Sequence, residues 1–206
     1  MDYPAKSSLS SRMNFPPVYL ASRSPRRREL LNQMAVDFAV IAPDVDESVQ
    51  PGEAPESYVE RIAVDKARAG LDMLTARDKK PVLAADTAVI LGQEIFGKPV
   101  NDADARRMLK MLSGNTHKVM TAVALAFSEK ILTAISVSQV SFAPLNEAQI
   151  DWYIQTGEGR DKAGSYAVQG LGALFIDHIH GSYSGIMGLP IRETGQLLMQ
   201  MDTDSR

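Results

Sequence analysis

A carboxylate inside an apolar segment is the first feature of this sequence that could take part in chemistry. Asp86 interrupts the hydrophobic run from Pro81 to Leu91, directly before Thr87. Taking an unpaired carboxylate out of water is costly, so a buried aspartate needs a cation, a metal ion or a catalytic task as its partner. The alternative is a structural aspartate that accepts hydrogen bonds from backbone amides. We expect Asp86 to belong to a functional site.

A cluster of hydroxyls and arginines precedes it in the chain. The segment Ser22-Arg23-Ser24-Pro25-Arg26-Arg27-Arg28 joins a predicted buried strand, Val18–Ala21, to a helix that should begin at Pro25 with Ser24 as its cap. Free N–H groups at a helix start, two hydroxyls and several guanidinium groups together suit phosphate groups. The alternative is a capped helix followed by solvated arginines.

Further charged residues are candidates for the same site. The acidic loop Asp44-Val45-Asp46-Glu47 carries oxygen ligands of the kind that Mg²⁺ prefers, although a solvated acidic loop is the commoner explanation. Lys66 and Lys98 add cations, and most lysines are surface charges. We expect these residues to belong to the functional site only if the fold brings them close to Asp86.

Several other chemistries are excluded or disfavoured by missing motifs. The chain has no P-loop motif, no G-x-G-x-x-G after a strand, no H-E-x-x-H and no cysteine, and Gly181-Ser-Tyr-Ser-Gly185 has Tyr where a nucleophile elbow needs Ser. His178 and His180 could share one face of a strand as metal ligands, but a third ligand is not visible, which favours a structural role.

The elements that must position these residues alternate along the chain, which is typical of an α/β protein. The predicted strands are Val18–Ala21, Asp37–Ile41, Pro81–Leu91, Val119–Phe127 and Ile131–Phe142. Predicted helices begin at Pro25, after Pro55, at Asp102 or Asp104, at a capping box formed by Asn146 and Gln149, and near Ile191.

The amino-acid composition indicates the general class of protein. The 206 residues are 45% hydrophobic and 23% charged with a net charge of −3, as expected for a globular chain and unlike a basic nucleic-acid-binding domain. No apolar run approaches the roughly 20 residues of a membrane span. We expect a loose tail over residues 1–16, one domain over residues 17–206, no nucleic-acid or membrane partner, and a cytoplasmic location.

Four motifs in order resemble the Maf family of nucleoside triphosphate pyrophosphatases. They are Leu20-Ala-Ser-Arg-Ser-Pro-Arg-Arg-Arg-Glu-Leu-Leu31, Ala85-Asp-Thr87, Gly97-Lys-Pro99, and Asp161-Lys-Ala-Gly164 with Gln169-Gly170. The resemblance implies a fold of the Maf and inosine-triphosphatase type, with an elongated mixed sheet, flanking helices and a substrate cleft between two lobes. It also implies hydrolysis of a nucleoside triphosphate to a monophosphate and pyrophosphate, with Mg²⁺, Mn²⁺ or Co²⁺ as cofactor, and it suggests a homodimer.

The same resemblance assigns roles to individual residues. It makes Asp86 the proton acceptor, places Ser22, Arg26 and Arg27 in the phosphate-contacting loop, and places Lys66, Lys98 and Glu47 among the charges lining the site. Our hypothesis is that Asp86 activates water and holds the metal ion together with Glu47. These charges suit a triphosphate because cations neutralise its developing negative charge while a carboxylate deprotonates water.

Substrate preference is implied by Arg26, Thr87 and Gln169, which fit the family branch that acts on dTTP and UTP. A neighbouring branch that acts on 7-methyl-GTP has Trp, Gln and Glu at these positions. The amide of Gln169 can both donate to and accept from a pyrimidine, whereas a cationic methylguanine favours a carboxylate. Two alternatives stay open: a 7-methyl-GTP pyrophosphatase, and a nucleotide-binding regulator of septum formation or cell division.

Overall fold

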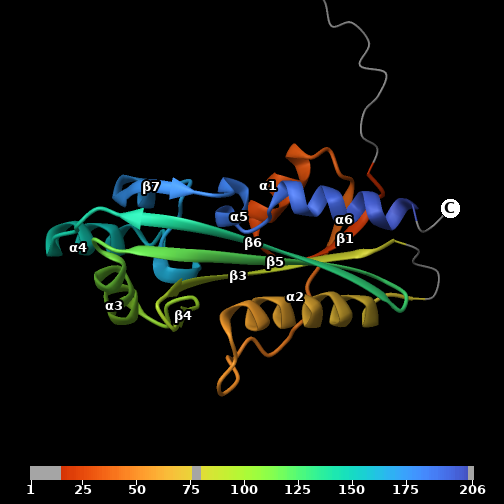
Figure 1. Cartoon of the computed structure of the whole chain (residues 1–206), viewed down its shortest axis with the longest axis horizontal. Helices are drawn as coiled ribbons and strands as arrows, with labels where there is room; N and C mark the ends of the chain where they lie inside the picture. The colour runs from red at the N-terminus through yellow and green to blue at the C-terminus, as the bar shows by residue number, and fades with distance from the viewer. Residues whose placement is uncertain (1–14, 76–79, 204–206) are drawn as a thin grey trace, which may run out of the picture.

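One mixed β-sheet forms the frame of the chain (Figure 1). The computed structural model describes residues 15–75 and 80–203, so residues 1–14 of the expected tail lie outside it. The described residues form a seven-stranded sheet in the order β2-β1-β3-β5-β6-β7, with β4 also paired to β3. The strands are β1 (Val18–Ala21), β2 (Phe38–Ile41), β3 (Val82–Leu91), β4 (Glu94–Phe96), β5 (Thr116–Phe127), β6 (Lys130–Phe142) and β7 (Ile176–His180).

Strand β3 has an interrupted edge. One of its edges pairs with β5 along almost its whole length, from Val82 to Ile90. On the other edge, parallel β1 reaches only to Leu83 and antiparallel β4 begins only at Val89. In the described part of the chain, residues 84–88 therefore have a strand partner on one side only. Ligands in open α/β sheets bind beyond the carboxyl ends of strands, and Asp86 and Thr87 lie within this opening, beyond the carboxyl end of β1.

Helices cover both faces of the sheet (Figure 1). Helix α2 (Pro55–Asp72) packs on one face, where its apolar side meets Ala84 and Ala88 of β3. On the opposite face, α1 (Pro25–Gln33), α5 (Tyr183–Met187) and α6 (Ile191–Thr203) contribute to a second core with Leu83 and Ala85. Helices α3 (Asp102–Leu112) and α4 (Glu147–Thr156) lie at the end of the sheet where β4 is found. None of the helices in the described ranges is both long and apolar enough to cross a membrane.

The structure confirms the α/β class and each predicted strand and helix, with shifts of a few residues at their ends. It also confirms the capping box of Asn146 and Gln149. Helix α1 begins at Pro25 as predicted, but the Ser24 side chain makes no capping hydrogen bond. Instead the Ser24 backbone amide donates to Ser22 Oγ at 3.2 Å, so Ser24 takes part in a turn within the loop through its main chain. Strands β4 and β7 and helix α5 were not predicted.

Candidate active site

A single pocket brings the sequence-predicted site residues together. It opens beside the interrupted edge of β3 and has a volume of about 420 Å³, within the usual range for small-molecule sites. Its lining includes all the candidates, which are Ser22, Arg26, Arg27, Glu47, Lys66, Asp86, Thr87, Lys98 and Gln169. They come from the loops after β1, β2 and β4, from the first turn of α1, from α2, from the middle of β3 and from the segment before β7.

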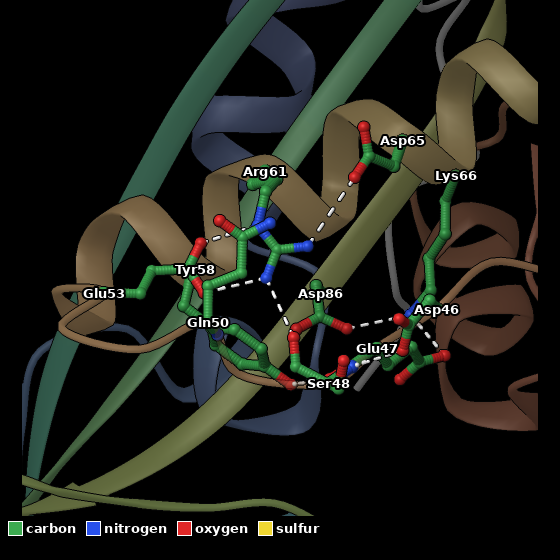
Figure 2. Close-up of polar contacts among 10 residues, drawn as sticks. All are labelled: Asp46, Glu47, Ser48, Gln50, Glu53, Tyr58, Arg61, Asp65, Lys66 and Asp86. Atoms are coloured by element: carbon green, nitrogen blue, oxygen red, sulfur yellow. Dashed lines mark hydrogen bonds and ion pairs between the residues drawn. The ribbon is translucent and has the colours of Figure 1, made fainter.

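Asp86 and Glu47 share one ammonium group. Lys66 Nζ, on α2, lies 2.8 Å from Asp86 Oδ1 and 2.9 Å from Glu47 Oε1, and Figure 2 shows the two carboxylates converging on it. The Asp86 side chain is 7% exposed and that of Glu47 is 44% exposed. Lys66 reaches Asp86 because residues 84, 86 and 88 alternate with 85 and 87 and face α2. The buried aspartate therefore has the cation that its sequence context required.

The environment shifts the pKa values of Asp86 and Glu47 in opposite directions. Burial raises the pKa of Asp86 above its usual value, and the charges of Lys66 and Arg27 only partly oppose this. Partial burial acts in the same direction on Glu47, but the hydrogen bond and charge of Lys66 outweigh it and hold the pKa of Glu47 below its usual value. A carboxylate with a raised pKa is a better proton acceptor than an ordinary one, so Asp86 is the stronger base of the pair.

The carboxylate pair fits a magnesium ion only as part of a larger ligand set. No group of three or more His, Asp or Glu side chains suited to a metal occurs among the residues that the structure describes. Mg²⁺ is often held by one or two carboxylates while substrate phosphates and water supply the other ligands. Glu47 and Asp86 meet that requirement. Asp46 does not join them, because its Oδ1 accepts from the Ser48 amide at 2.9 Å within the loop.

A second cluster surrounds the guanidinium group of Arg27. Its Nε donates to the Gly188 carbonyl at 2.8 Å, its Nη1 to Ser22 Oγ at 3.1 Å and its Nη2 to Thr87 Oγ1 at 3.4 Å. Thr87 Oγ1 also forms a hydrogen bond with Thr121 Oγ1 at 2.9 Å, and Thr121 Oγ1 donates to the Gly185 carbonyl at 2.8 Å. The chain of hydrogen bonds holds a cation at the pocket wall. Burial lowers the pKa of Arg27, and the nearby Asp86 carboxylate opposes that shift.

Arg26, Lys98 and Gln169 complete the lining. Arg26 Nε donates to the Met187 carbonyl at 3.2 Å, and its Nη1 lies 4.0 Å from Asp161 across the pocket. Lys98 and Gln169 are exposed at the pocket surface. The lining therefore includes the cations of α1 and Lys98 as well as the neutral amide of Gln169 on the segment before β7.

The segment that carries Gln169 is wrapped around a carboxylate. Glu158 accepts hydrogen bonds from the Tyr153 hydroxyl at 2.8 Å and from the amides of Leu171 at 2.9 Å and Gly172 at 3.0 Å. The Tyr153 hydroxyl in turn accepts from the Ala167 amide at 3.1 Å. Both flanks of Gln169 are thus fixed to one buried tyrosine and its glutamate partner. Burial opposes ionisation of Glu158, but these hydrogen bonds hold its pKa below the usual value.

Sequence reasoning missed several residues that shape the site. Thr121 lies opposite Thr87 in the register of β3 and β5, which only the pairing of the strands could show. Tyr166 lines the pocket, and its hydroxyl lies 2.8 Å from Nε2 of the buried His117. His178 and His180 are both exposed on β7, and within the described ranges neither belongs to a group of three or more side chains suited to a metal.

Known proteins of similar sequence share one name. A relative from Pseudoalteromonas atlantica, named dTTP/UTP pyrophosphatase, is 49% identical over 183 residues, covering 88% of this chain and 95% of the relative. Relatives of the same name from Aromatoleum aromaticum (192 residues, covering 93% of the relative) and Xanthomonas campestris (183 residues, covering 96%) are each 51% identical and cover 88% of this chain.

Fold and family are settled by two further comparisons. The Ham1 protein of Staphylococcus aureus has a similar structure, with a TM-score of 0.50 at 16% identity, covering 92% of this chain and 100% of Ham1, which shows likeness of fold alone. The family model described as Maf-like protein matches residues 17–201. Because this model covers most of the chain and the relatives are about 50% identical to it, the chain belongs to the Maf family.

Proposed function

We propose that this protein hydrolyses dTTP and UTP to the nucleoside monophosphate and pyrophosphate. The observation that carries the proposal is the pocket itself, in which a buried carboxylate of raised pKa faces a wall of arginine and lysine side chains. The name dTTP/UTP pyrophosphatase, which the relatives share, supports the same reaction.

The cationic wall suits the triphosphate. The segment from Ser22 to Arg27 consists of a short loop and the first turn of α1, where free N–H groups and the positive end of the helix dipole favour anions. Arg27 is held by Gly188, Ser22 and Thr87, so it needs little reorganisation to meet a phosphate. Arg26 and Lys98 add charge at the pocket surface. Together they would stabilise the negative charge that grows on the phosphates during reaction.

Asp86 is the proposed proton acceptor. In this step a water oxygen attacks the α-phosphorus, the water proton passes to a carboxylate oxygen of Asp86, and the bond from the α-phosphorus to the bridging oxygen breaks to release pyrophosphate. Lys66 holds Asp86 through Oδ1 at 2.8 Å, which fixes the direction of the other carboxylate oxygen. Proton transfer to a positioned group of this kind typically contributes 10²–10⁴-fold to the rate.

Glu47 and Asp86 are the proposed metal ligands. A bound Mg²⁺, Mn²⁺ or Co²⁺ ion would neutralise phosphate charge there. Glu47 fits this role because its low pKa keeps it ionised at neutral pH and because it lies beside Asp86 on the shared lysine.

Gln169 is the proposed reader of the base. Its amide can donate to a carbonyl oxygen and accept from an N–H, as the pyrimidine edge of dTTP and UTP requires. Its flanks are fixed by Tyr153 and Glu158, which makes its position reproducible. We further propose a cytoplasmic location, where nucleoside triphosphates are abundant. The homodimer stays a prediction.

The test is pyrophosphate release from a panel of dTTP, UTP, CTP, ATP, GTP, ITP and 7-methyl-GTP, with Mg²⁺ or with EDTA. We expect metal-dependent turnover confined mainly to dTTP and UTP. Turnover led by 7-methyl-GTP would contradict the assignment of Gln169 while leaving the reaction intact. Nucleotide binding without any pyrophosphate release would overturn the enzymatic proposal and favour a regulatory protein.

A further inference from the structure

The position of Glu47 is not explained by burial. It lies in the long loop between β2 and α2, residues 42–54, and residues 46–52 of that loop are exposed. An exposed loop of this length has no core contact to fix it, and its ordering costs conformational entropy. Yet the Glu47 carboxylate lies 2.9 Å from Lys66 Nζ. Some other contact must hold the loop against α2.

Arg61 supplies that contact. Its Nε and Nη2 donate to the two carboxylate oxygens of Glu53 at 2.5 and 2.7 Å, a bidentate pair, and Nη2 also donates to the Ser48 carbonyl at 3.0 Å. Figure 2 shows the guanidinium group between α2 and the loop. Arginine is suited to this task because its planar group presents several donors in a fixed geometry. One side chain thus reaches the loop on both sides of Gln50.

The surrounding contacts make the connection to Glu47 direct. Tyr58, one helical turn before Arg61, donates its hydroxyl to the Glu47 carbonyl at 3.0 Å, and the Arg61 guanidinium lies 5.8 Å from the centre of the Tyr58 ring. The Gln50 amide donates to Glu53 at 3.0 Å. The Glu53 side chain is only 8% exposed. The bond to Arg61 lowers the pKa of Glu53 to about 2, so the pair stays charged across the physiological range.

We propose that Arg61 is a positioning residue of this active site, which acts through Glu53 and Ser48 to keep the Glu47 carboxylate on Lys66 beside Asp86. This inference rests on the proposed function, in which Glu47 takes part in the reaction. Arg61 itself does not line the pocket. Its removal should therefore affect turnover by displacing Glu47.

A second arginine provides a matched control. Arg107 on α3 donates to Glu94 at 2.6 Å and lies 5.6 Å from the centre of the Phe96 ring, which resembles the arrangement of Arg61, Glu53 and Tyr58. Neither Arg107 nor Glu94 lines the pocket. The experiment compares Arg61→Met, Arg61→Lys, Glu53→Gln and the double variant Arg61→Met/Glu53→Gln with Arg107→Met and Glu94→Gln.

Three readouts test the role. We expect Arg61→Met to lower kcat for dTTP about 10- to 100-fold, since small displacements in a site have effects of that size, while KM changes less than about threefold. The kcat of Arg61→Lys should fall between those of this variant and wild type, because lysine keeps the charge but lacks the planar pair of donor nitrogens that binds Glu53 in a bidentate way. The double variant should be no worse than Arg61→Met, because both changes remove the same contact. Hydrogen exchange at the Ser48 and Gln50 amides should accelerate in Arg61→Met.

Other results would overturn the proposal. These are a kcat for Arg61→Met within twofold of wild type, an equal loss of kcat in Arg107→Met, or unchanged amide exchange in the loop. Absence of dTTP turnover by wild-type protein would overturn the proposed function alone. Loop exchange measured on the same variants would then decide whether Arg61 holds the loop.

Discussion

At the scale of single residues, neighbouring positions of β3 have different tasks. Asp86 faces α2 and meets Lys66, whereas Thr87 faces the opposite side and joins the hydrogen bonds around Arg27. Side chains of consecutive strand residues point to opposite faces. Because both lie where β3 lacks a partner on one edge, both still reach the same pocket. The strand therefore links the proton acceptor to the phosphate-binding wall within two residues.

Replacing the proton acceptor gives the first prediction. Asp86→Asn keeps the shape of the side chain but removes its capacity to accept a proton, so we expect kcat for dTTP to fall 10²–10⁴-fold with little change in KM. The control is Asp177→Asn, at an exposed position of β7 outside the pocket. Steady-state pyrophosphate release measures both. An Asp86→Asn variant that retains more than about a tenth of wild-type kcat would show that another group takes the proton.

Changing the amide of Gln169 gives the second prediction. Gln169→Glu replaces a group that donates and accepts with one that only accepts, which is unfavourable for a pyrimidine edge and favourable for a cationic methylguanine. We expect the ratio of kcat/KM for dTTP to that for 7-methyl-GTP to fall at least tenfold. Glu147→Gln, an exposed change on α4, is the control. An unchanged ratio would mean that the base is read elsewhere in the pocket.

At the scale of elements, the segment before β7 depends on the close approach of a glycine to a carboxylate. A Cβ atom at Gly170 would lie 2.2 Å from Glu158 Oε2. That oxygen cannot move away without losing the Leu171 amide. The glycine next to Gln169 is therefore required for packing, and the segment is a fixed wall of the pocket.

This contact leads to the third prediction. Gly170→Ala should lower the midpoint of thermal unfolding by several degrees and raise KM for dTTP, because the Glu158 carboxylate must leave its amide partners. In a Glu158→Ala background the obstacle is absent, so the added effect of Gly170→Ala should largely disappear. A double-mutant cycle of unfolding and KM measures this coupling. Additive effects of the two changes would contradict the proposed clash.

The sequence predicted some parts of the site and of the fold and missed others. Asp86 stood out because a carboxylate inside an apolar run needs a partner, and the arginines stood out because they crowd the start of a helix. The pairing of Arg61 with Glu53 gave no such signal, since both look like solvated charges until the loop folds back on α2. Strand β7 and helix α5 were missed because the glycine-rich stretch around them has neither a helical nor a strand period. Lys66 was a candidate from the sequence, but most lysines are surface charges, and only the family resemblance assigned it a place in the site.

At the scale of the whole molecule, a buried histidine couples stability to pH. His117 is 1% exposed and packs against the rings of Phe142 and Tyr166, with centroid distances of 5.2 and 5.4 Å. Burial lowers the pKa of His117 to about 4 from an ordinary 6.5. Between these values the unfolded chain binds a proton that the folded chain does not. Stability should therefore fall as pH falls from 6.5 towards 4.

The fourth prediction follows from that difference. The full shift corresponds to roughly 3 kcal/mol of unfolding free energy, lost progressively on acidification. His117→Gln should remove this part of the pH dependence, so urea unfolding at pH 7 and pH 4.5 should differ less in the variant than in wild type. His178→Gln, at an exposed position, is the control. The same pH dependence in His117→Gln and wild type would show that the histidine is not buried in its neutral form.

The interrupted edge of β3 also has a consequence for solubility. An unpaired strand edge ordinarily offers its backbone to a strand from another molecule, which is a route to aggregation. Here the open length is limited to residues 84–88, with β1 closing one end and β4 the other. An incoming strand would have to enter a short slot lined by Arg27, Lys66 and Asp86 and to bury their charges. The register of β1 and β4 therefore both opens the sheet to a small molecule and closes it to another polypeptide.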